Sequence, residues 1–379
     1  MMNSAPGPNG GPAETGRASG GGRATVLVAM SGGVDSSVAA ALLVEQGYRV
    51  IGATMKTFCY QDTPVHGRTC CGLDGIMDAR RVADQLGIAH HVFDMEASFG
   101  ESVIDDFVSE YVAGRTPNPC VRCNSNTKIP HLLERGRALG ADFIATGHYA
   151  RLRRPESGPP QLLRGVDPEK DQSYFLWGVP RSVLDRMLFP VGKLSKEAVR
   201  ERARALALAT AEKPESQEIC FVPGNDYAEF LASRLGEDHP SLEPGRLVTR
   251  EGREIGAHEG YARYTVGQRK GLGGGLPRRL YVLGTRPGRN EVVVGDRSEL
   301  MGETVRLGDL NWLGPPPKAG ARVSVRLRHQ APLVAARVES IADEVILSLD
   351  RAQRAITPGQ SGAVYRGQVL LGGGRIRAN

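Results

Sequence analysis

The sequence predicts an α/β protein in which an N-terminal parallel sheet is followed by a small mixed central domain and a C-terminal β-barrel. Three observations lead to this prediction. Strands and helices alternate from Val26 to about Phe221, turns with short β-rich runs follow from about Val222, and alternating strands fill the chain beyond about Gly295. Alternation of strands with helices is typical of a parallel sheet covered on both faces, whereas successive strands separated by turns are typical of a barrel or sandwich.

The first part of the chain supplies the elements of the parallel sheet. Residues 26–29 are an apolar run of the kind that forms a buried strand, and residues 38–43 are expected to form a helix that Gly47 ends. The next expected elements are a strand over 50–54, a helix over 78–87, a strand over 91–93, a helix over 134–140 and a strand over 143–146. Ligands of such sheets bind beyond the carboxyl ends of the strands, where Met55 and Gly147 also fall.

Beyond residue 222 the expected elements are mainly strands. A helix is expected over 227–235 and a β-rich run over 279–283, and later strands are expected over 322–328, 334–338, 345–349 and 363–365. The domains expected are a disordered tail over 1–22, the parallel-sheet domain over 23–221, a central linking domain over 222–295 and the barrel over 296–379. The tail is rich in Gly, Pro, Ala and Ser and has no apolar stretch, so we expect no secretory signal there.

Composition limits the class of protein. The chain has 379 residues, of which 40% are hydrophobic, and this is enough for the cores of two or three domains. No apolar run approaches the roughly 20 residues that cross a bilayer, so we predict a cytoplasmic protein without membrane contact. Six cysteines in a cytosolic chain of this size are typical of thiols, metal ligands or redox catalysts rather than of structural disulfides.

Positive charge is concentrated at the end of the chain. The formal net charge is +6, and residues 297–379 contain 12 Lys and Arg against 7 Asp and Glu. A basic excess confined to one end indicates a surface for a polyanion, above all nucleic acid. A merely solvated basic surface is an equal alternative on charge alone.

A glycine-rich loop lies between the first predicted strand and the first predicted helix. It consists of Ala29, Met30, Ser31, Gly32, Gly33, Val34, Asp35, Ser36 and Ser37. Because the two glycines permit a turn that a Cβ would obstruct, several N–H groups can converge at the start of the helix and bind a phosphate or pyrophosphate group. The loop lacks the Gly-Lys-Ser/Thr of a Walker loop. It resembles the Ser-Gly-Gly-x-Asp-Ser loop of the ATP pyrophosphatases, which cleave ATP between its α and β phosphates.

Two cysteines follow a segment with a constrained backbone. Cys120 and Cys123 come after residues 114–119, whose glycine and two prolines exclude a continuous helix. A cysteine on such a loop beside arginines can react as a thiolate. Cys220 lies about a hundred residues further along the chain. The spacing leaves open whether Cys123 and Cys220 meet, and each of them could be an ordinary buried thiol.

Six motifs, taken in order, resemble those of the tRNA-specific 2-thiouridylases. They are SGGVDSS at 31–37, GRTPNP at 114–119 with the following Cys123 and Asn124, TGHY at 146–149, KDQSY at 170–174, SQEICF at 216–221 and YTVGQRKGL at 264–272. The likeness runs from about Thr25 to Arg375. Few of these motifs are specific individually, but their ordered set is. The resemblance implies an ATP pyrophosphatase catalytic domain at the N-terminus and a tRNA-binding barrel at the C-terminus.

The resemblance also implies roles for individual residues. Cys123 would be the nucleophile and Cys220 the persulfide carrier, and the two could form a disulfide. ATP would be held by Ala29, Met30, Ser31, Gly32, Gly33, Val34, Asp35, Ser36, Met55 and Gly147. Contacts with tRNA would come from Asn118, Pro119 and Cys120 near the target base and from Lys170, Asp171, Gln172, Arg326 and Leu327, and tRNA selectivity from His148 and Gln360. This chain departs from the family pattern at Leu327, where an aromatic residue is usual, and at Cys120, where many relatives have Asp.

The implied reaction is the ATP-dependent 2-thiolation of uridine 34, the wobble position of tRNA. Because the C2 carbonyl oxygen is a poor leaving group, ATP would first adenylate it and release pyrophosphate, with help from the glycine-rich loop and Mg²⁺. Sulfur from a persulfide on Cys220 would then displace AMP, and Cys123 would either reduce the persulfide or close a disulfide. The implied partners are tRNA and a persulfide donor, which is either a cysteine desulfurase or a sulfur relay protein.

Three alternatives remain open at this point. The thiolates of Cys120, Cys123 and Cys220 could hold three corners of an iron–sulfur cluster that carries sulfide in the same thiolation. The first two could instead be half of a zinc site with Cys59, Cys70 or Cys71, although the chain has no second Cys-x-x-Cys. Finally, the chain could be a nonenzymatic RNA-binding module, which the glycine-rich loop argues against. We assign no residue as a metal ligand.

Overall fold

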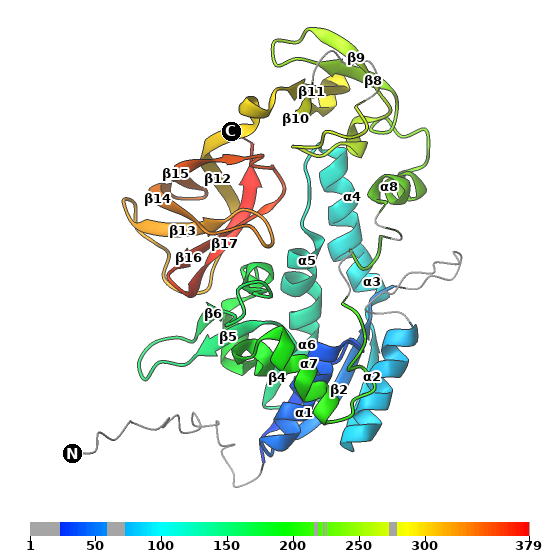
Figure 1. Ribbon diagram of the computed structural model, residues 1–379, viewed down its shortest axis with the longest axis vertical. Helices are drawn as coiled ribbons and strands as arrows, with labels where there is room; N and C mark the ends of the chain where they lie inside the picture. Colours follow the sequence, from blue (N-terminus) through cyan, green and yellow to red (C-terminus); the bar gives the residue numbers. More distant parts are fainter. Residues whose placement is uncertain are drawn as a thin grey trace, which may run out of the picture.

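The computed structural model describes residues 23–58, 73–215, 219–222, 224, 226–272 and 279–378. These residues form three regions: an N-terminal α/β region, a central β region at the opposite end of the long axis, and a C-terminal barrel at the side (Figure 1). The predicted fold class is therefore confirmed. The expected tail over 1–22, together with Cys59, Cys70 and Cys71, lies outside the described residues.

Five strands of the described chain form a parallel sheet in the N-terminal region. In sheet order they are β3 (Ala89–Asp94), β2 (Arg49–Lys56), β1 (Thr25–Ala29), β4 (Phe143–Thr146) and β7 (Met187–Leu188). The chain order reverses at β1, which lies between β2 and β4. Such a reversal opens a crevice at the carboxyl ends of the strands. The sequence predicts the first four strands with ends within two residues of those observed, but it does not predict β7.

Helices cover both faces of this sheet. They are α1 (Val34–Glu45), α2 (Leu73–Leu86), α6 (Ile129–Ala138) and α7 (Lys196–Ala205). Between α2 and α6 the chain forms α3 (Glu96–Phe99), α4 (Asp105–Val112) and α5 (Pro119–Arg122), of which α3 and α4 contribute to the core of the central region. Neighbouring residues of a strand point to opposite faces, so β1 contributes to two cores. Leu27 belongs to one core with Ile129 of α6, whereas Val26 and Val28 belong to the other with Val38 of α1.

The central region is a small sheet that shares an aromatic core with α4. Its strands, in sheet order, are β10 (Tyr281–Arg286), β11 (Glu291–Gly295), β8 (Gly245–Val248) and β9 (Glu254–His258), and α8 (Tyr227–Leu235) precedes them with the predicted bounds. The ring of Phe107 in α4 lies 5.2 Å from that of Phe221 and 5.9 Å from that of Phe230. These contacts hold the segment that carries Cys220 against α4.

Six strands of the described chain close into the C-terminal barrel. In order around the barrel they are β12 (Met301–Trp312), β15 (Val345–Arg354), β14 (Val334–Ile341), β13 (Arg322–Arg326), β16 (Ser361–Arg366) and β17 (Val369–Arg377), which pairs with β12. A hairpin of the N-terminal region, β5 (Ala150–Arg153) and β6 (Gln161–Arg164), extends this sheet, because Leu163 pairs with Val369. The barrel is thus joined to the N-terminal region by strand pairing (Figure 1).

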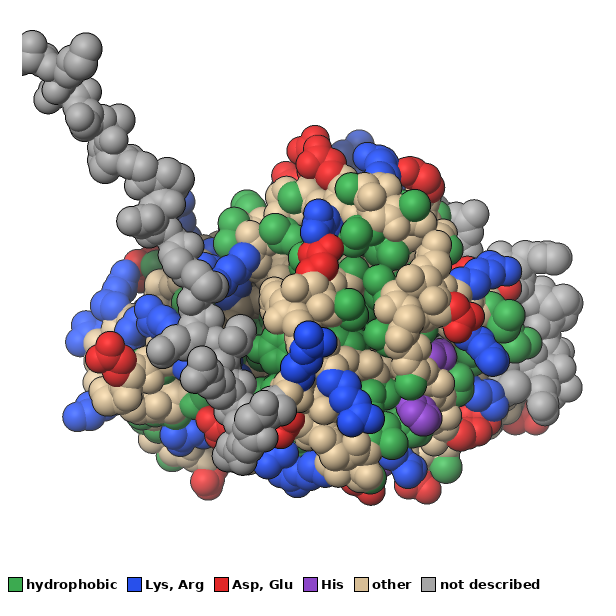
Figure 2. Space-filling view, turned by 90° about the horizontal axis from the view of Figure 1, so that it is seen from below, with side chains coloured by type: hydrophobic (Ala, Val, Ile, Leu, Met, Phe, Trp, Pro, Cys, Tyr) green, Lys and Arg blue, Asp and Glu red, His purple; other side chains and the backbone are tan. Residues whose placement is uncertain are grey.

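The surface seen from below carries both signs of charge. Figure 2 shows Lys and Arg side chains interspersed with Asp and Glu, and this face has no continuous basic field. In the part of the chain that the structure describes, no helix is long and apolar enough to cross a membrane.

Candidate active site

A cavity of about 910 Å³ lies at the carboxyl edge of the parallel sheet, where β1, β2 and β4 end. The sequence predicts a ligand site at this edge and ATP contacts from ten residues, all of which the structure describes. Nine of them line the cavity, namely Ala29, Met30, Ser31, Gly33, Val34, Asp35, Ser36, Met55 and Gly147, and Gly32 does not. The volume falls within the roughly 300–1,000 Å³ that is usual for small-molecule sites.

The glycine-rich loop turns sharply at Gly32 and passes directly into α1. Gly32 has a φ of +70°, and a Cβ at this position would overlap the carbonyl oxygen of Gly75 in α2. The helix begins at Val34, four residues before the predicted start, so its N-terminus lies at the cavity. The hydroxyl of Ser36 accepts a hydrogen bond from the N–H of Ser31 at 3.2 Å. The first N–H groups of α1 have no partner within the helix, and they and the helix dipole favour an anionic ligand.

Gly147 allows the end of β4 to approach the start of α1. A Cβ on Gly147 would lie 2.7 Å from the backbone nitrogen of Ser36 and 2.8 Å from the carbonyl carbon of Asp35. Both of these atoms belong to the backbone, so a side chain at position 147 would have to displace the glycine-rich loop. The close packing of these two loops shapes the end of the cavity next to the start of α1.

Replacement of Gly147 by alanine is expected to weaken ATP binding about tenfold or more, because the new methyl group displaces the backbone of the loop. Titration calorimetry with ATP on the whole protein measures this effect. Gly314→Ala is the matched control, since a Cβ at Gly314 meets nothing within 4 Å. Equal ATP affinities for the two variants would show that the loop tolerates the extra methyl group.

A network of charged side chains crosses one wall of the cavity. The ammonium of Lys196 lies 2.7 Å and 2.9 Å from the two carboxylate oxygens of Asp35, and 2.7 Å from Oε1 of Glu215. The other oxygen of Glu215 lies 2.9 Å from Nζ of Lys170. The hydroxyl of Tyr149 donates to Oδ1 of Asp35 at 2.7 Å. The network therefore connects the glycine-rich loop with residues of two distant segments, and all of its members line the cavity.

The electrostatics of this network keep Glu215 ionised and Tyr149 protonated. Burial raises the pKa of Glu215, but hydrogen bonds from Lys196 and Lys170 outweigh this effect and hold the pKa below its usual value. Burial and the nearby charge of Asp35 raise the pKa of Tyr149. Two ammonium groups thus face two carboxylates, with a neutral phenol beside them.

Lys196, Tyr149 and Glu215 are not among the site residues that the sequence predicts. Tyr149 stands within the TGHY motif and Glu215 immediately precedes the SQEICF motif, and this proximity is the sequence signal for both residues. Lys196 is in no motif. The available signal is its place as the first residue of α7, where the helix dipole disfavours a cation.

His148 lies at the same cavity as a neutral imidazole. Its Nδ1 is 2.8 Å from the hydroxyl of Thr146, and the residue lines the cavity beside Lys128. Burial and, to a smaller extent, the charge of Lys128 lower the pKa of His148 to about 3. The ring is therefore uncharged at neutral pH and acts there through hydrogen bonds.

The structure places Cys123 and Cys220 against one hydrophobic cluster. Both are partly buried and pack against a core that includes Phe99 and Phe221, although they are almost a hundred residues apart in the chain. Cys120 is exposed. Within the described ranges, no group of three or more His, Cys, Asp or Glu side chains is arranged to hold a metal ion.

A short helix and a π-helical turn present Cys123. The side chain of Asn118 caps α5 by accepting a hydrogen bond from the N–H of Val121 at 3.2 Å, and Pro119 occupies the first helical position, where it is well tolerated. Cys123 is the first residue of the π-helical turn Cys123–Lys128. Such turns are rare and frequently mark functional sites.

The residues with predicted tRNA contacts are divided between the cavity and the interface with the barrel. Lys170 and Gln172 line the cavity. The side chain of Gln360 donates hydrogen bonds to the carbonyl oxygens of Thr116 at 3.2 Å and Pro117 at 2.8 Å. Gln360 therefore fastens the loop before Asn118 to the barrel.

One predicted arrangement in the barrel is wrong. The sequence predicts a strand over 322–328, but β13 ends at Arg326. Arg326 is only 4% exposed and its guanidinium points to Asp171, with Nη1 3.0 Å from Oδ2, whereas Arg328 is exposed. Asp171 and Leu327 are also buried. The strand pattern could not reveal this inward turn because the partner carboxylate is 155 residues away.

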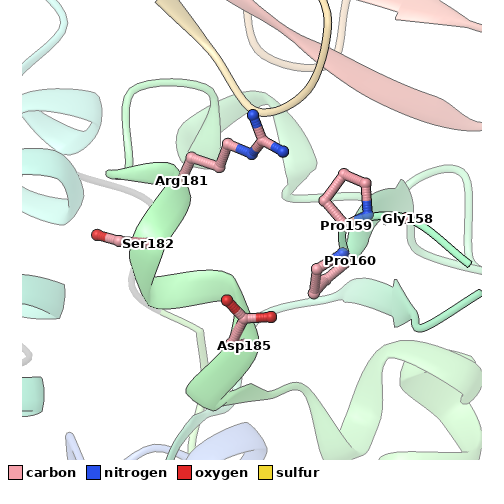
Figure 3. A pocket seen from close by; sticks show the side chains of 6 residues that line it. All are labelled: Gly158, Pro159, Pro160, Arg181, Ser182 and Asp185. Atoms are coloured by element: carbon pink, nitrogen blue, oxygen red, sulfur yellow. The ribbon is translucent and has the colours of Figure 1, made fainter.

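A second cavity, of about 600 Å³, lies away from all of these residues. It is lined by Gly158, Pro159, Pro160, Arg181, Ser182 and Asp185. Figure 3 shows the two prolines, which follow β5, facing a helical turn that carries Arg181 and Asp185, while Ser182 points away. No residue that the sequence singles out for chemistry lines it, and we assign it no part in the reaction.

Comparison with known proteins agrees with the arrangement of fold and site. Residues 24–224 match the model of the tRNA methyl transferase HUP domain, residues 228–296 that of the tRNA methyl transferase PRC-barrel domain, and residues 303–376 that of the aminomethyltransferase beta-barrel domain. The sheet, the loop and the barrel thus define a protein of the HUP-domain class associated with tRNA.

The full-length relatives define the family more narrowly. The chain is 48% identical over 359 residues to the tRNA-specific 2-thiouridylase MnmA of Geotalea uraniireducens (strain Rf4), which covers 93% of this chain and 95% of that protein. It is also 48% identical over 361 residues to the protein of that name from Carboxydothermus hydrogenoformans, and this match covers 94% of this chain and 98% of that protein. The chain belongs to the tRNA-specific 2-thiouridylase family. The predicted resemblance is confirmed, and so, at the level of the family, is the predicted enzyme class.

Proposed function

We propose that this protein catalyses the ATP-dependent 2-thiolation of uridine 34 in tRNA, giving 2-thiouridine, AMP and pyrophosphate. The observation that carries the proposal is the cavity at the end of the sheet, which is lined by the glycine-rich loop. Family membership supports the same reaction. We further propose that residues 23–221 perform the chemistry, that residues 222–295 link the domains and that residues 296–379 bind tRNA.

In the first step the C2 oxygen of uridine attacks the α phosphorus of ATP and pyrophosphate leaves. The N–H groups at the start of α1 bind the phosphates, and Ser36 and Gly147 hold the loop in shape. The carboxylate of Asp35 lines the cavity and suits Mg²⁺, which prefers oxygen ligands and would neutralise charge on the phosphates. Lys196 and Tyr149 orient this carboxylate.

In the second step sulfur replaces the adenylated oxygen. The terminal sulfur of a persulfide on Cys220 forms a bond to C2, and AMP leaves with the former carbonyl oxygen. The thiolate of Cys123 then attacks the sulfur of Cys220, so that a disulfide forms and the S–S bond to the transferred sulfur breaks. In the other route, Cys123 attacks first and releases hydrosulfide, which reacts with C2. A thiol reductant reopens the disulfide in both routes. The shared hydrophobic cluster of the two cysteines supports either route.

The partners follow from this chemistry. The persulfide on Cys220 requires a sulfur donor, a cysteine desulfurase or a sulfur relay protein, and the reducing cytoplasm keeps the thiols available. Asn118, Pro119 and Cys120 would approach the target base, and His148 would contribute to tRNA selectivity as a neutral imidazole. A Cys-ligated iron–sulfur cluster that carries sulfide is the alternative that the sequence leaves open. The arrangement of the described residues does not favour it, because Cys120 is exposed and no three of their His, Cys, Asp or Glu side chains are placed to hold a metal ion. Iron analysis of protein purified without oxygen tests it.

The proposal is tested by incubating the protein with ATP, a persulfide source and an unmodified tRNA transcript, followed by mass analysis of the nucleosides. We expect a gain of sulfur at uridine 34 that depends on ATP and is accompanied by AMP and pyrophosphate. A transcript with cytidine at position 34 is the control. Absence of 2-thiouridine in the complete reaction, under conditions in which the protein binds both ATP and tRNA, would refute the proposal.

A further inference from the structure

The segment 170–172 lies between the barrel and the cavity at the carboxyl edge of the parallel sheet, which we call the nucleotide cavity. Lys170 and Gln172 line the cavity, whereas the side chain of Asp171 between them is completely buried. Lys170 pairs with Glu215, and the side-chain oxygen of Gln172 accepts a hydrogen bond from the N–H of Tyr149 at 3.0 Å. Lys170 and Gln172 therefore face the cavity, whereas the side chain of Asp171 points away from it.

Asp171 is the point at which this segment is attached to the barrel. One of its oxygens lies 2.8 Å from Nε of Arg164 and 3.0 Å from Nη1 of Arg326, and the other accepts the N–H groups of Gly165 and Ser173, each at 3.1 Å. Burial raises the pKa of Asp171, but these hydrogen bonds and the charge of Arg326 hold it below its usual value. The carboxylate is thus ionised and fully paired, and Arg326 is its partner from the barrel.

Further contacts join the same segment to the barrel. The guanidinium of Arg326 lies 5.8 Å from the ring centre of Tyr365, whose hydroxyl is 3.1 Å from that of Ser173. The hydroxyl of Tyr174 donates to the carbonyl oxygen of Ser361 at 3.1 Å. Since a shift of Asp171 would leave the buried guanidinium of Arg326 without this carboxylate, the segment cannot easily move while the barrel stays in place.

We propose that Arg326 is a positioning residue through which the docked barrel holds Lys170 and Gln172 at the nucleotide cavity. The guanidinium of Arg326 acts inward, on the segment that lines the cavity. A buried ion pair is weak evidence for a stabilising role, because a hydrophobic pair of similar volume often stabilises the fold equally well. We infer that the pair of Asp171 and Arg326 instead fixes the position of the segment 170–172. This inference rests on the proposed function in one respect, namely that the ligand of the cavity is taken to be ATP.

The proposed coupling follows a continuous set of contacts. Asp35 of the glycine-rich loop pairs with Lys196, Lys196 with Glu215 and Glu215 with Lys170, and the next residue along the chain, Asp171, pairs with Arg326. Physical contact alone does not show coupling, so the effect of breaking the last contact on ATP binding has to be measured.

The test is the variant Arg326→Met in the full-length protein, with ATP binding measured by calorimetry in the absence of tRNA. We expect ATP affinity to fall about three- to tenfold, the usual range for a residue that acts through its neighbours. Arg326→Lys keeps the charge and is expected to restore most of the affinity. In a separate titration over several salt concentrations, tRNA binding by Arg326→Met is expected to keep the wild-type salt dependence.

Arg375→Met is the matched control. Arg375 also crosses from the barrel to the N-terminal region, where it lies 2.9 Å from Asp106 and 2.7 Å from Glu110, but none of these residues lines the nucleotide cavity. This variant is expected to lower the thermal midpoint and leave ATP affinity unchanged. If Arg326→Met does not fold, Asp171→Asn replaces it, because the asparagine keeps the volume and an oxygen for the backbone N–H groups.

Three results would overturn the proposal. Wild-type ATP affinity in Arg326→Met would show that the pair does not position the cavity. An equal loss of ATP affinity in Arg375→Met would make the effect one of barrel docking in general. A tRNA salt dependence lowered by about one phosphate contact, with ATP affinity unchanged, would show that Arg326 contacts tRNA. All three can be read even if the protein thiolates no tRNA, because ATP and tRNA binding are measured directly.

Discussion

Cys220→Ser is expected to abolish both tRNA thiolation and the loading of a persulfide on the protein, whereas Cys123→Ser abolishes thiolation only. The reason is that a hydroxyl neither carries sulfane sulfur nor attacks a disulfide at neutral pH, while the volume of the side chain hardly changes. Thiolation is measured by nucleoside mass analysis, and loading by the mass of the intact protein after incubation with a persulfide source. Both cysteines are partly buried against the same hydrophobic cluster, so their surroundings alone do not distinguish them. A variant that loads the persulfide but does not thiolate tRNA distinguishes the role of Cys123 from that of Cys220.

Folding and ATP binding are the controls for these two variants. The thermal midpoints are expected to stay within about 2 °C of wild type, since isosteric changes at partly exposed sites cost little. ATP affinity is expected to be unchanged because neither cysteine lines the nucleotide cavity. Normal thiolation by Cys220→Ser would contradict the persulfide assignment, and normal thiolation by Cys123→Ser would contradict the nucleophile assignment.

The glycine-rich loop could be predicted because its information is local. A short apolar strand, two glycines and a helix follow one another within about twenty residues, and each imposes its own backbone geometry. The structure places nine of the ten predicted ATP contacts at one cavity. The helix nevertheless begins at Val34 rather than at residue 38, since periodicity does not mark the first turn, which carries Asp35 and Ser36.

Contacts between distant segments could not be predicted in this way. Lys196 meets Asp35 across 161 residues, and Arg326 meets Asp171 across 155. Separations of this length are unrelated to the periodicity of a strand or helix, so the sequence pattern does not reveal these contacts. The alternation of arginine with apolar residues around Arg326 indicates an exposed arginine side chain. The guanidinium instead points inward, because it pairs with the buried carboxylate of Asp171. The pairing of β6 with β17 is equally invisible in the sequence, because the hairpin that contains β6 belongs to another region of the chain.

The cysteine pair stands between these two cases. Spacing alone left open whether Cys123 and Cys220 meet, and the family resemblance implied that they do. In the structure Phe107 of α4 packs on Phe221, and both cysteines pack on the hydrophobic cluster that contains these rings. The aromatic core of the central region therefore holds the Cys220 segment near α4, and a reaction between the two cysteines stays a prediction.

Lys196→Met is expected to reduce tRNA-dependent pyrophosphate release about tenfold or more, because the carboxylate of Asp35 then faces the ATP phosphates without the ammonium that pairs with it, and Glu215 loses one of its two ammonium partners. The side chain of Lys196 is only 11% exposed, so solvent screens these charges poorly. Lys196→Arg keeps a cation at the same place and is expected to recover part of the rate. Pyrophosphate release is followed with a coupled enzymatic assay, with and without tRNA.

Lys193→Met is the matched control for this prediction, because Lys193 is an exposed lysine three residues earlier that does not line the cavity. Removing it takes away the same charge from the protein but leaves the network intact, so its rate is expected to equal that of wild type. Persulfide loading on Cys220 should be unchanged in both variants, since it requires no ATP. If Lys196→Met and Lys193→Met release pyrophosphate equally fast, Lys196 does not compensate the carboxylates during adenylation, and the close contacts of its ammonium serve only to dock α7 on α1.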